Sequence, residues 1–227
     1  SWSTAANWTP NTGVPGDNAG DTVTINTAYT VTLSSSKSIA ALTMSGASGL
    51  TLSGDITLTV SGNVSITVAG TKVNFDGAAA GTAITVGGDM TVGVGVIFEG
   101  NVLGYAAGYG PTAPTGNLTA TTGATYRGGD GNGGGGGGHG GAGGAGNAGA
   151  AGPAYGNTTL APLTMGSGGG GGYTASPGGA GGGGLSLSVA GTLSHSGTIR
   201  ANAGNGTLSG VYTYDDGQGS SATSWTD

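Results

Sequence analysis

A five-residue unit recurs every eight residues in the N-terminal third of this chain, and it constrains the fold more than any other feature. The unit reads Leu or Ile, Thr, an apolar residue, Ser or Ala, and Gly, and its four copies begin at Leu42, Leu50, Leu58 and Ile66. Variant copies lie at 84–88 and 187–191. Alternating apolar and polar residues are typical of a strand, and the closing glycine is typical of a turn. A short strand that recurs with a fixed turn predicts an all-β fold of the β-solenoid (β-helix) class.

The unit also predicts which residues form the core, because a strand points alternate side chains inward. We expect three pairs to stack in ladders inside the solenoid: Leu50 with Leu52, Leu58 with Val60, and Ile66 with Val68. Thr51, Thr59 and Thr67 would form an outward ladder, and three strands would make a coil of roughly 24 residues. A β-sandwich is the alternative fold. It is disfavoured because sandwich strands do not usually repeat one unit in register.

Glycine is the second organising feature of the sequence. The chain has 56 glycines among 227 residues, and 6% of its residues are charged, against roughly 25% in an average domain. From 128 to 152, glycine occupies every third position. This is the period of a polyproline-II-type helix and not of an α-helix or a strand. The run therefore predicts an extended polyglycine-II strand, whose backbone groups need partners on neighbouring strands or in water.

A second glycine-rich stretch, from 166 to 184, also has glycine at every third position, with Ala175 as the one exception. The link before it carries three apolar anchors, Leu160, Leu163 and Met165. Two such stretches joined by a returning link predict an inserted pair of antiparallel polyglycine-II strands. We expect the pair to pack against the solenoid or a neighbouring subunit, because the ordering entropy of so many glycines must be offset.

The sequence accordingly divides into four regions. Residues 1–21 are polar and turn-rich and carry Trp2 and Trp8, which predicts an N-terminal cap over an open core edge. We predict a β-solenoid over 22–126, the glycine-rich insertion over 127–184, and returning solenoid strands with a C-terminal tail over 185–227. The chain starts at Ser1 without a signal peptide, so we interpret it as a mature or trimmed form.

Two segments resemble known proteins. The strings AANW, VPG and GDTVTI, at 5–8, 14–16 and 20–25, resemble the entry segment of bacterial cell-surface and autotransporter-type β-helix proteins. The string GGGGLSLSVAGTLSHSGTIRANAGNG, at 181–206, resembles a glycine-rich insertion that re-enters a bacterial β-helix. The resemblance implies a tryptophan-containing cap before the first coil and an extracellular or cell-surface location.

Charge and composition argue against several classes of partner. The net charge is -6, and the four fixed cations, Lys37, Lys72, Arg127 and Arg200, are scattered, whereas a nucleic-acid-binding face needs clustered Lys and Arg. No apolar run approaches the 18 or so residues of a membrane span, so no membrane insertion is expected. The chain has no cysteine, which excludes thiolate–metal and disulfide chemistry.

The residues that most often carry chemistry form no convincing constellation. His139 lies in the glycine run and His195 in a strand, and we expect both to be ordinary histidines. Asp130 lies in a GGDGNGGGG string that lacks the nonapeptide period of calcium-binding repeats. Asp215 and Asp216 are adjacent and would point apart on an extended chain, unlike a glycosidase pair. We therefore expect no catalytic, cofactor or metal site, and the chain is predicted not to be an enzyme.

The first functional hypothesis is a non-enzymatic extracellular structural protein. A solenoid has open strand edges at its two ends, and open edges pair with other chains. A head-to-tail contact that does not close gives a filament, which predicts a homopolymeric surface filament, sheath or adhesive stalk. The expected subunit contacts are aromatic residues near the two chain ends: Trp2, Trp8, Tyr212, Tyr214 and Trp225.

Two other functions remain open. The glycine-rich texture resembles the polyglycine-helix distal domains of phage tail-fibre adhesins, which implies recognition of a glycan or another cell-surface ligand. In that case the expected recognition residues are the tyrosines in or beside the glycine-rich segments: Tyr105, Tyr109, Tyr155 and Tyr173. Ice binding is a third hypothesis, because Thr-x-Thr units at 22–24, 30–32 and 57–59 would order water on a flat solenoid face.

Overall fold

The structure is a computed structural model that describes residues 1–10, 12–18, 20–76, 82–106, 165–169 and 178–205. The glycine run predicted at 128–152 and most of its link to the second run lie outside these residues. Within the described ranges the protein is all-β, and its one helical element is a short 3-10 turn, η1 (Ala5–Asn7).

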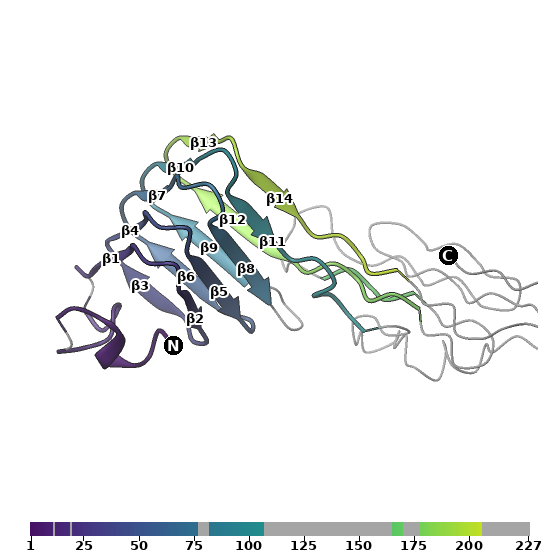
Figure 1. Cartoon of the computed structure of the whole chain (residues 1–227), viewed down its shortest axis with the longest axis horizontal. Helices are drawn as coiled ribbons and strands as arrows, with labels where there is room; N and C mark the ends of the chain where they lie inside the picture. Colours follow the sequence, from purple (N-terminus) through teal and green to yellow (C-terminus); the bar gives the residue numbers. More distant parts are fainter. Residues whose placement is uncertain (11, 19, 77–81, 107–164, 170–177, 206–227) are drawn as a thin grey trace, which may run out of the picture.

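The strands form three parallel sheets that enclose a common interior (Figure 1). Sheet A contains β1 (Thr22–Ile25), β4 (Ala41–Met44), β7 (Val64–Ile66), β10 (Met90–Val92) and β13 (Leu193–His195). Sheet B contains β2 (Thr30–Leu33), β5 (Gly49–Ser53), β8 (Lys72–Asp76), β11 (Ile97–Glu99) and β14 (Thr198–Arg200). Sheet C contains β3 (Lys37–Ile39), β6 (Thr57–Val60), β9 (Thr82–Val86) and β12 (Leu185–Val189).

The chain visits sheets A, B and C in turn, so three consecutive strands complete one coil and the next coil stacks on it. The strand pairings within the three sheets are parallel. This arrangement is compatible with the predicted β-solenoid. It does not match the β-sandwich alternative, whose two sheets are antiparallel.

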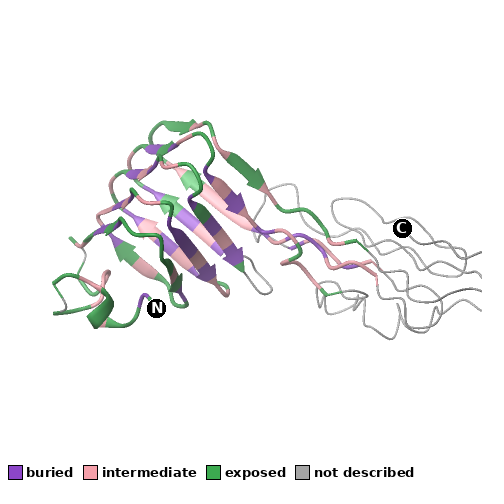
Figure 2. Cartoon of the chain, in the orientation of Figure 1, coloured by how far each residue is buried: buried purple, intermediate pink, exposed green. Residues whose placement is uncertain are grey.

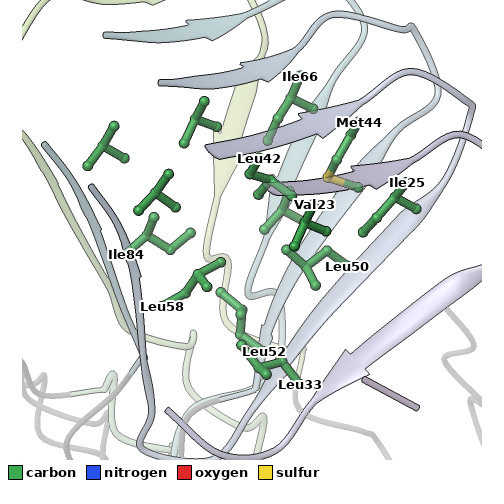
Figure 3. Close-up of a cluster of buried hydrophobic side chains, with 14 of the residues drawn as sticks. Val23, Ile25, Leu33, Leu42, Met44, Leu50, Leu52, Leu58, Ile66 and Ile84 are labelled. Atoms are coloured by element: carbon green, nitrogen blue, oxygen red, sulfur yellow. The ribbon is translucent and has the colours of Figure 1, made fainter. Parts of the chain in front are cut away.

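The inward side chains of the three sheets form one apolar core (Figures 2 and 3). Figure 3 shows Leu42 from sheet A, Leu50 from sheet B and Leu58 from sheet C facing the same interior. All three are at most 2% exposed, as the five-residue unit predicts. Phe75 and Phe98 occupy inward positions of sheet B in later coils, and they are equally buried.

The eight-residue spacing corresponds to one side of a coil. Leu50 pairs with Val73 of the next coil and Leu58 pairs with Ile84. Three strands make one coil, as the unit predicts, but the predicted ladders between successive eight-residue units are wrong, because successive units lie on three different sheets. Val68 lies beyond the end of β7 and is half-buried, so it is not a core position.

The outward ladders also follow the coil and not the eight-residue unit. Thr51 lies in sheet B and Thr59 in sheet C, so they do not form the single ladder that the unit predicts. The in-register outward column of sheet A, which we call the hydroxyl column, consists of Thr24, Thr43, Ser65, Thr91 and Ser194. Every member carries a hydroxyl group, and the column runs the full height of the stack.

The repeated glycines occupy turns for two different reasons. Gly54 and Gly70 have φ values of 92° and 84°, a backbone conformation that residues other than glycine rarely adopt. Gly46 and Gly62 instead lie against the backbone of the preceding coil. A Cβ at Gly46 would lie 2.8 Å from the carbonyl carbon of Asn26, and one at Gly62 would lie 2.7 Å from the carbonyl oxygen of Ala40. The close approach of successive coils thus excludes side chains at these turns.

The fourth coil contains the insertion, between β11 and β12, at the corner that joins sheet B to sheet C. Register is kept on both sides of it, since Phe98 pairs with Val73 before the insertion and Leu187 pairs with Ile84 after it. A corner of the stack lies at the surface, where a long excursion of the chain costs little beyond loop-closure entropy.

The crowded turns provide a test of the stacking. Replacing Gly46 by Ala places a methyl group within 2.8–3.1 Å of three backbone atoms of Asn26 and Thr27. We expect Gly46→Ala to lower the free energy of unfolding by about 1–3 kcal/mol, the usual cost of overpacking. Urea unfolding followed by circular dichroism measures this change.

The matched control is Gly13→Ala, because a Cβ at Gly13 has no neighbour within 4 Å. This variant should unfold at the same urea concentration as the parent chain or a slightly higher one. Equal effects of the two substitutions would contradict the close coil-to-coil approach at Gly46.

Candidate interaction surfaces

The described residues contain no candidate metal site. That part of the chain holds no group of three or more His, Cys, Asp or Glu side chains able to bind a metal ion. It also has no helix with the length and apolar character needed to cross a membrane. His195 lies in β13 with its ring 6.3 Å from that of Phe98, and its buried Nε2 atom has no hydrogen-bond partner. The candidate functional sites are surfaces at the two ends of the stack and at the insertion.

Tryptophan closes the core at the first coil. Trp2 is 1% exposed and belongs to the apolar core. Its backbone N–H donates to the carbonyl of Thr32 in β2 (2.9 Å), and its indole Nε1 donates to the carbonyl of Pro15 (2.8 Å). Trp8 packs edge-on against it, with ring centroids 5.2 Å apart, and its Nε1 donates to the Trp2 carbonyl (2.8 Å). Both indole N–H groups are thus satisfied within the chain.

The same N-terminal segment covers the edge of β3. Gly16 lies against the side chain of Lys37 and the carbonyl of Ser38. Lys37 also forms an ion pair with Asp17 at 2.8 Å. The hydrogen bond from Lys37 holds the pKa of the exposed Asp17 carboxyl below its usual value, with a smaller contribution from the N–H of Val14. The edges of β2 and β3 are therefore occupied by the chain itself.

The edge of β1 borders an open hollow of about 950 Å³ that extends to the start of β2. One wall is formed by the first coil from Thr22 to Val31, and the other by the N-terminal segment, which contributes Trp8 and Pro15. Tyr29, at the turn that leaves β1, also lines the hollow and is 74% exposed. An unpaired strand edge beside an open space can accept another extended chain.

The last coil leaves its inward positions uncovered (Figure 2). Leu193 pairs with the fully buried Met90 but is 45% exposed itself. Ile199 pairs with the fully buried Phe98 and is 50% exposed. These residues have core character and core register, and they lack a further coil above them in the described structure.

An ion cluster joins the last coil to the rest of the stack on the outer face of sheet B. Arg200 donates to both carboxylate oxygens of Glu99, at 3.1 and 3.3 Å, and Lys72 lies 3.8 Å from the same carboxylate. Asn101 donates to Glu99 at 2.8 Å. The two-point Arg200–Glu99 contact links β14 to β11 across the whole insertion.

Four extended segments run side by side where the insertion leaves the stack, and we call this bundle the glycine root. It consists of residues 100–105, 165–169, 178–184 and 200–205. The second glycine-rich stretch was predicted to be one strand, and this prediction is wrong. Gly166 donates to Gly182, and Gly169 donates to Gly179. These bonds pair its two ends antiparallel. In the sequence, the YTASP string at 173–177 interrupts the glycines between those ends.

The segment 178–184 has three hydrogen-bonded neighbours in the glycine root. It bonds to 165–169 through the carbonyls of Gly179 and Gly182, and to 100–105 through Gly181 and Gly183. Its third neighbour is 200–205, where Gly204 donates to Ala180 at 2.7 Å. A strand in a flat sheet has only two neighbours, so these bonds leave the segment in three directions.

No side chain fits at the centre of the glycine root. A Cβ at Gly181 would overlap the carbonyl of Gly166, and one at Gly182 would overlap the carbonyl of Ala201. Met165, one of the predicted anchors, is buried at 5% exposure at the start of its segment. Backbone-to-backbone packing therefore requires glycine at Gly179, Gly181 and Gly182.

Tyr105 is half-buried at the glycine root, where its N–H donates to Gly166 and its carbonyl accepts from Gly181. Burial raises the pKa of its phenol above the usual value, and the nearby Asp55 carboxylate raises it further. The ring thus lies close to the corner between β5 and β6. Its environment stabilises the neutral phenol.

The structure locates only some of the residues predicted to make contacts. Trp2 and Trp8 lie at the first coil and Tyr105 lies at the glycine root. The remaining predicted contact and recognition residues lie outside the described residues: Tyr109, Tyr155, Tyr173, Tyr212, Tyr214 and Trp225. Trp2 is buried within its own chain, so a direct contact of its ring with another subunit would require the cap to move.

Sequence reasoning missed the exposed pair Leu193 and Ile199. Both occur in strand-like strings that look the same as those of buried coils, and only their position in the last coil exposes them. Tyr29 was also missed, although its place in the NTAY turn between two Thr-x-Thr units is a signal for an exposed aromatic residue.

Comparison with known proteins adds no relative to this description. No protein-family model, no curated protein sequence and no solved structure matches the chain.

The buried tryptophan of the cap provides a second test. Trp2→Ala removes a large core side chain, together with a hydrogen bond from its indole N–H. We expect the free energy of unfolding to fall by about 3–5 kcal/mol. Tyr29→Ala serves as the aromatic control, because this ring is 74% exposed, and it should change stability by less than about 0.5 kcal/mol. Urea titrations of the two variants compare them directly, and similar losses would show that Trp2 is not part of the core.

The phenol of Tyr105 predicts a pH dependence. Because its pKa is raised in the folded chain, its contribution to stability is fully present below the ordinary tyrosine pKa of about 10. That contribution declines as the pH rises above this value and is lost as the pH passes the pKa of the folded state. Tyr105→Phe should therefore unfold with a shallower loss of stability between about pH 9 and pH 11 than the parent chain. Denaturant titrations at several pH values measure this, and parallel pH profiles would contradict the assignment.

Proposed function

We propose that this protein is a non-enzymatic structural protein of the cell surface, a subunit of a surface filament, sheath or adhesive stalk that assembles head to tail. In this proposal the stacked coils are a β-solenoid that provides a rigid shaft. The observation that carries it is the uncovered last coil, where Leu193 and Ile199 are exposed at positions that are buried in the coil below. An apolar core that ends open is typical of a stack that is continued by another element.

The difference between the two ends supports a head-to-tail arrangement over a symmetric one. Trp2 closes the core at the first coil, whereas the described last coil has no such cover. Two unlike surfaces form a heterologous contact, and a heterologous contact that does not close on itself generates an open filament. The extracellular location in this proposal rests on the resemblance of the segments 5–25 and 181–206 to bacterial cell-surface β-helix proteins.

The proposal includes a polyglycine-II insertion projecting from the shaft. Two features of the glycine root support it. The segment 178–184 bonds to three neighbours, and the carbonyls that face 165–169 belong to Gly179 and Gly182, three residues apart. A helix with three residues per turn directs its carbonyls in this way.

Negative-stain electron microscopy and analytical ultracentrifugation of the purified chain, over a range of salt and protein concentrations, test the structural function. We expect filaments of uniform width whose proportion rises with protein concentration. Dispersed monomers under all conditions would contradict the proposal.

A receptor- or glycan-binding adhesin is the second candidate, and the position of Tyr105 favours it. Tyr105 is an aromatic residue held by two backbone hydrogen bonds at the base of the glycine root, beside segments that have no room for side chains. Aromatic rings next to such a rigid base would recognise a glycan or another surface ligand. Binding on a glycan array that is lost in Tyr105→Ala, with the fold intact, would favour this function.

Ice binding is supported by one observation, the in-register hydroxyl column of sheet A. Threonine is also simply a good exposed strand residue, so the column has an ordinary explanation. Thermal hysteresis in a solution of the protein would favour ice binding, and its absence would argue against it.

A further inference from the structure

The first coil leaves one strand edge for a partner. The N-terminal segment reaches the edge of β2 through the Trp2–Thr32 hydrogen bond, and it lies against β3 through Gly16 and the Asp17–Lys37 ion pair. The edge of β1 faces the hollow instead, with Trp8 and Tyr29 on its walls. A partner that binds at this end of the stack would therefore pair with β1 of sheet A.

The other terminal strand of sheet A is β13. Its inward residue Leu193 is 45% exposed, and Ile199 in the adjacent β14 is 50% exposed. The inward Nε2 atom of His195 has no hydrogen-bond partner. One sheet thus carries an unpaired edge at each end of the stack, and the apolar residues that need cover lie beside one of them.

The two edges are complementary because sheet A is parallel throughout. In a parallel sheet the donors and acceptors on one side of a strand match those on the opposite side of a strand that runs the same way. The edge of β13 in one molecule therefore matches the edge of β1 in the next, and it does not match a second β13 without reversing the strand direction. A parallel pairing would continue the hydroxyl column from Ser194 of one copy to Thr24 of the next.

From these observations we infer that the β13 edge of one copy docks in the hollow beside β1 of a second copy and extends sheet A between subunits. Leu193 and Ile199 pack against the N-terminal segment of that copy, where Trp8 lines the hollow. The inference rests on the proposed head-to-tail assembly and assigns its surfaces. It differs from the expected direct contact through Trp2, because Trp2 stays buried in its own chain.

The absence of native cysteine allows a direct test by disulfide trapping. The full-length variant Thr24→Cys/Ser194→Cys is oxidised mildly and analysed on a non-reducing gel. Within one chain the two positions are four strand spacings apart, roughly 19 Å. A disulfide needs Cα atoms within about 7 Å, so any bond joins two copies. We expect a ladder of covalent multimers.

Single-cysteine variants establish the orientation of the contact. A mixture of Thr24→Cys and Ser194→Cys chains should give covalent dimers that contain one chain of each kind. The control pair Thr24→Cys/Thr91→Cys places its second cysteine on the same exposed column but inside the sheet, and it should give no ladder. Thr24→Cys chains that link only to one another would overturn the inference in favour of a symmetric contact.

The apolar part of the contact is tested with two charge substitutions. Leu193→Glu should lower the yield of the Thr24–Ser194 crosslink by about tenfold or more, because a buried contact residue is replaced by a charge. Val94→Glu is the control, since Val94 is 76% exposed at the turn that follows β10, one coil inside the terminal strand β13, and it should leave the yield unchanged. Equal yields in the two variants would overturn the apolar contact.

The same samples viewed by electron microscopy separate this inference from the proposed function. Filaments without the crosslink would leave the structural function standing and overturn the assignment of surfaces. Dispersed monomers without the crosslink would contradict both. Crosslinking only after deletion of residues 206–227 would show that the chain's own C-terminal residues cover the last coil, which also overturns the inference for the full-length protein.

Discussion

Parallel pairing of strands is the constraint on which this structure depends. A parallel strand cannot be joined to its neighbour by a tight hairpin, so the chain must travel around the core before it returns to the same sheet. Three short strands per circuit achieve this return, and each coil then covers the inward side chains of the previous one. The arrangement places apolar residues in register from coil to coil, for example Leu52 against Phe75. Its consequence is that the problem of unpaired edges is concentrated at the two ends.

The two ends solve that problem differently. At the first coil Trp2 and the turns around Gly16 occupy two of the three strand edges, and the indole N–H groups bond to backbone carbonyls. At the last coil the inward residues Leu193 and Ile199 remain exposed within the described structure. This asymmetry is the physical basis for proposing a polar assembly. The asymmetry arises because the N-terminal segment with Trp2 covers the core at the first coil, whereas no described segment covers the last coil.

The insertion shows how a regular stack can carry an irregular element. Residues 100–184 leave and re-enter at one corner, and the strands on either side keep their register with the coil below. The ion cluster around Glu99 ties Arg200 back to β11 after the excursion. The glycine root begins at this corner, where backbones approach so closely that a Cβ is excluded at Gly181 and Gly182.

The sequence by itself determined the all-β class, the inward positions of the repeated unit apart from Val68, and the turns that follow them. These features are local, because alternation and turn-forming glycines are properties of a few consecutive residues. The sequence also indicated that Trp2 and Trp8 belong to a cap over the core. It did not determine which residues stack, since Leu42, Leu50 and Leu58 look alike although they lie on three different sheets.

Only the tertiary structure decided which residues stack between coils, and that Gly46 and Gly62 are needed for coil contact whereas Gly54 and Gly70 are needed for backbone conformation. It also decided that the second glycine stretch folds back on itself. It placed two apolar residues in the same register, and left Leu193 exposed while Met90 is buried. Each of these outcomes depends on which segments become neighbours in space. That information is spread over many coils and is absent from any one of them.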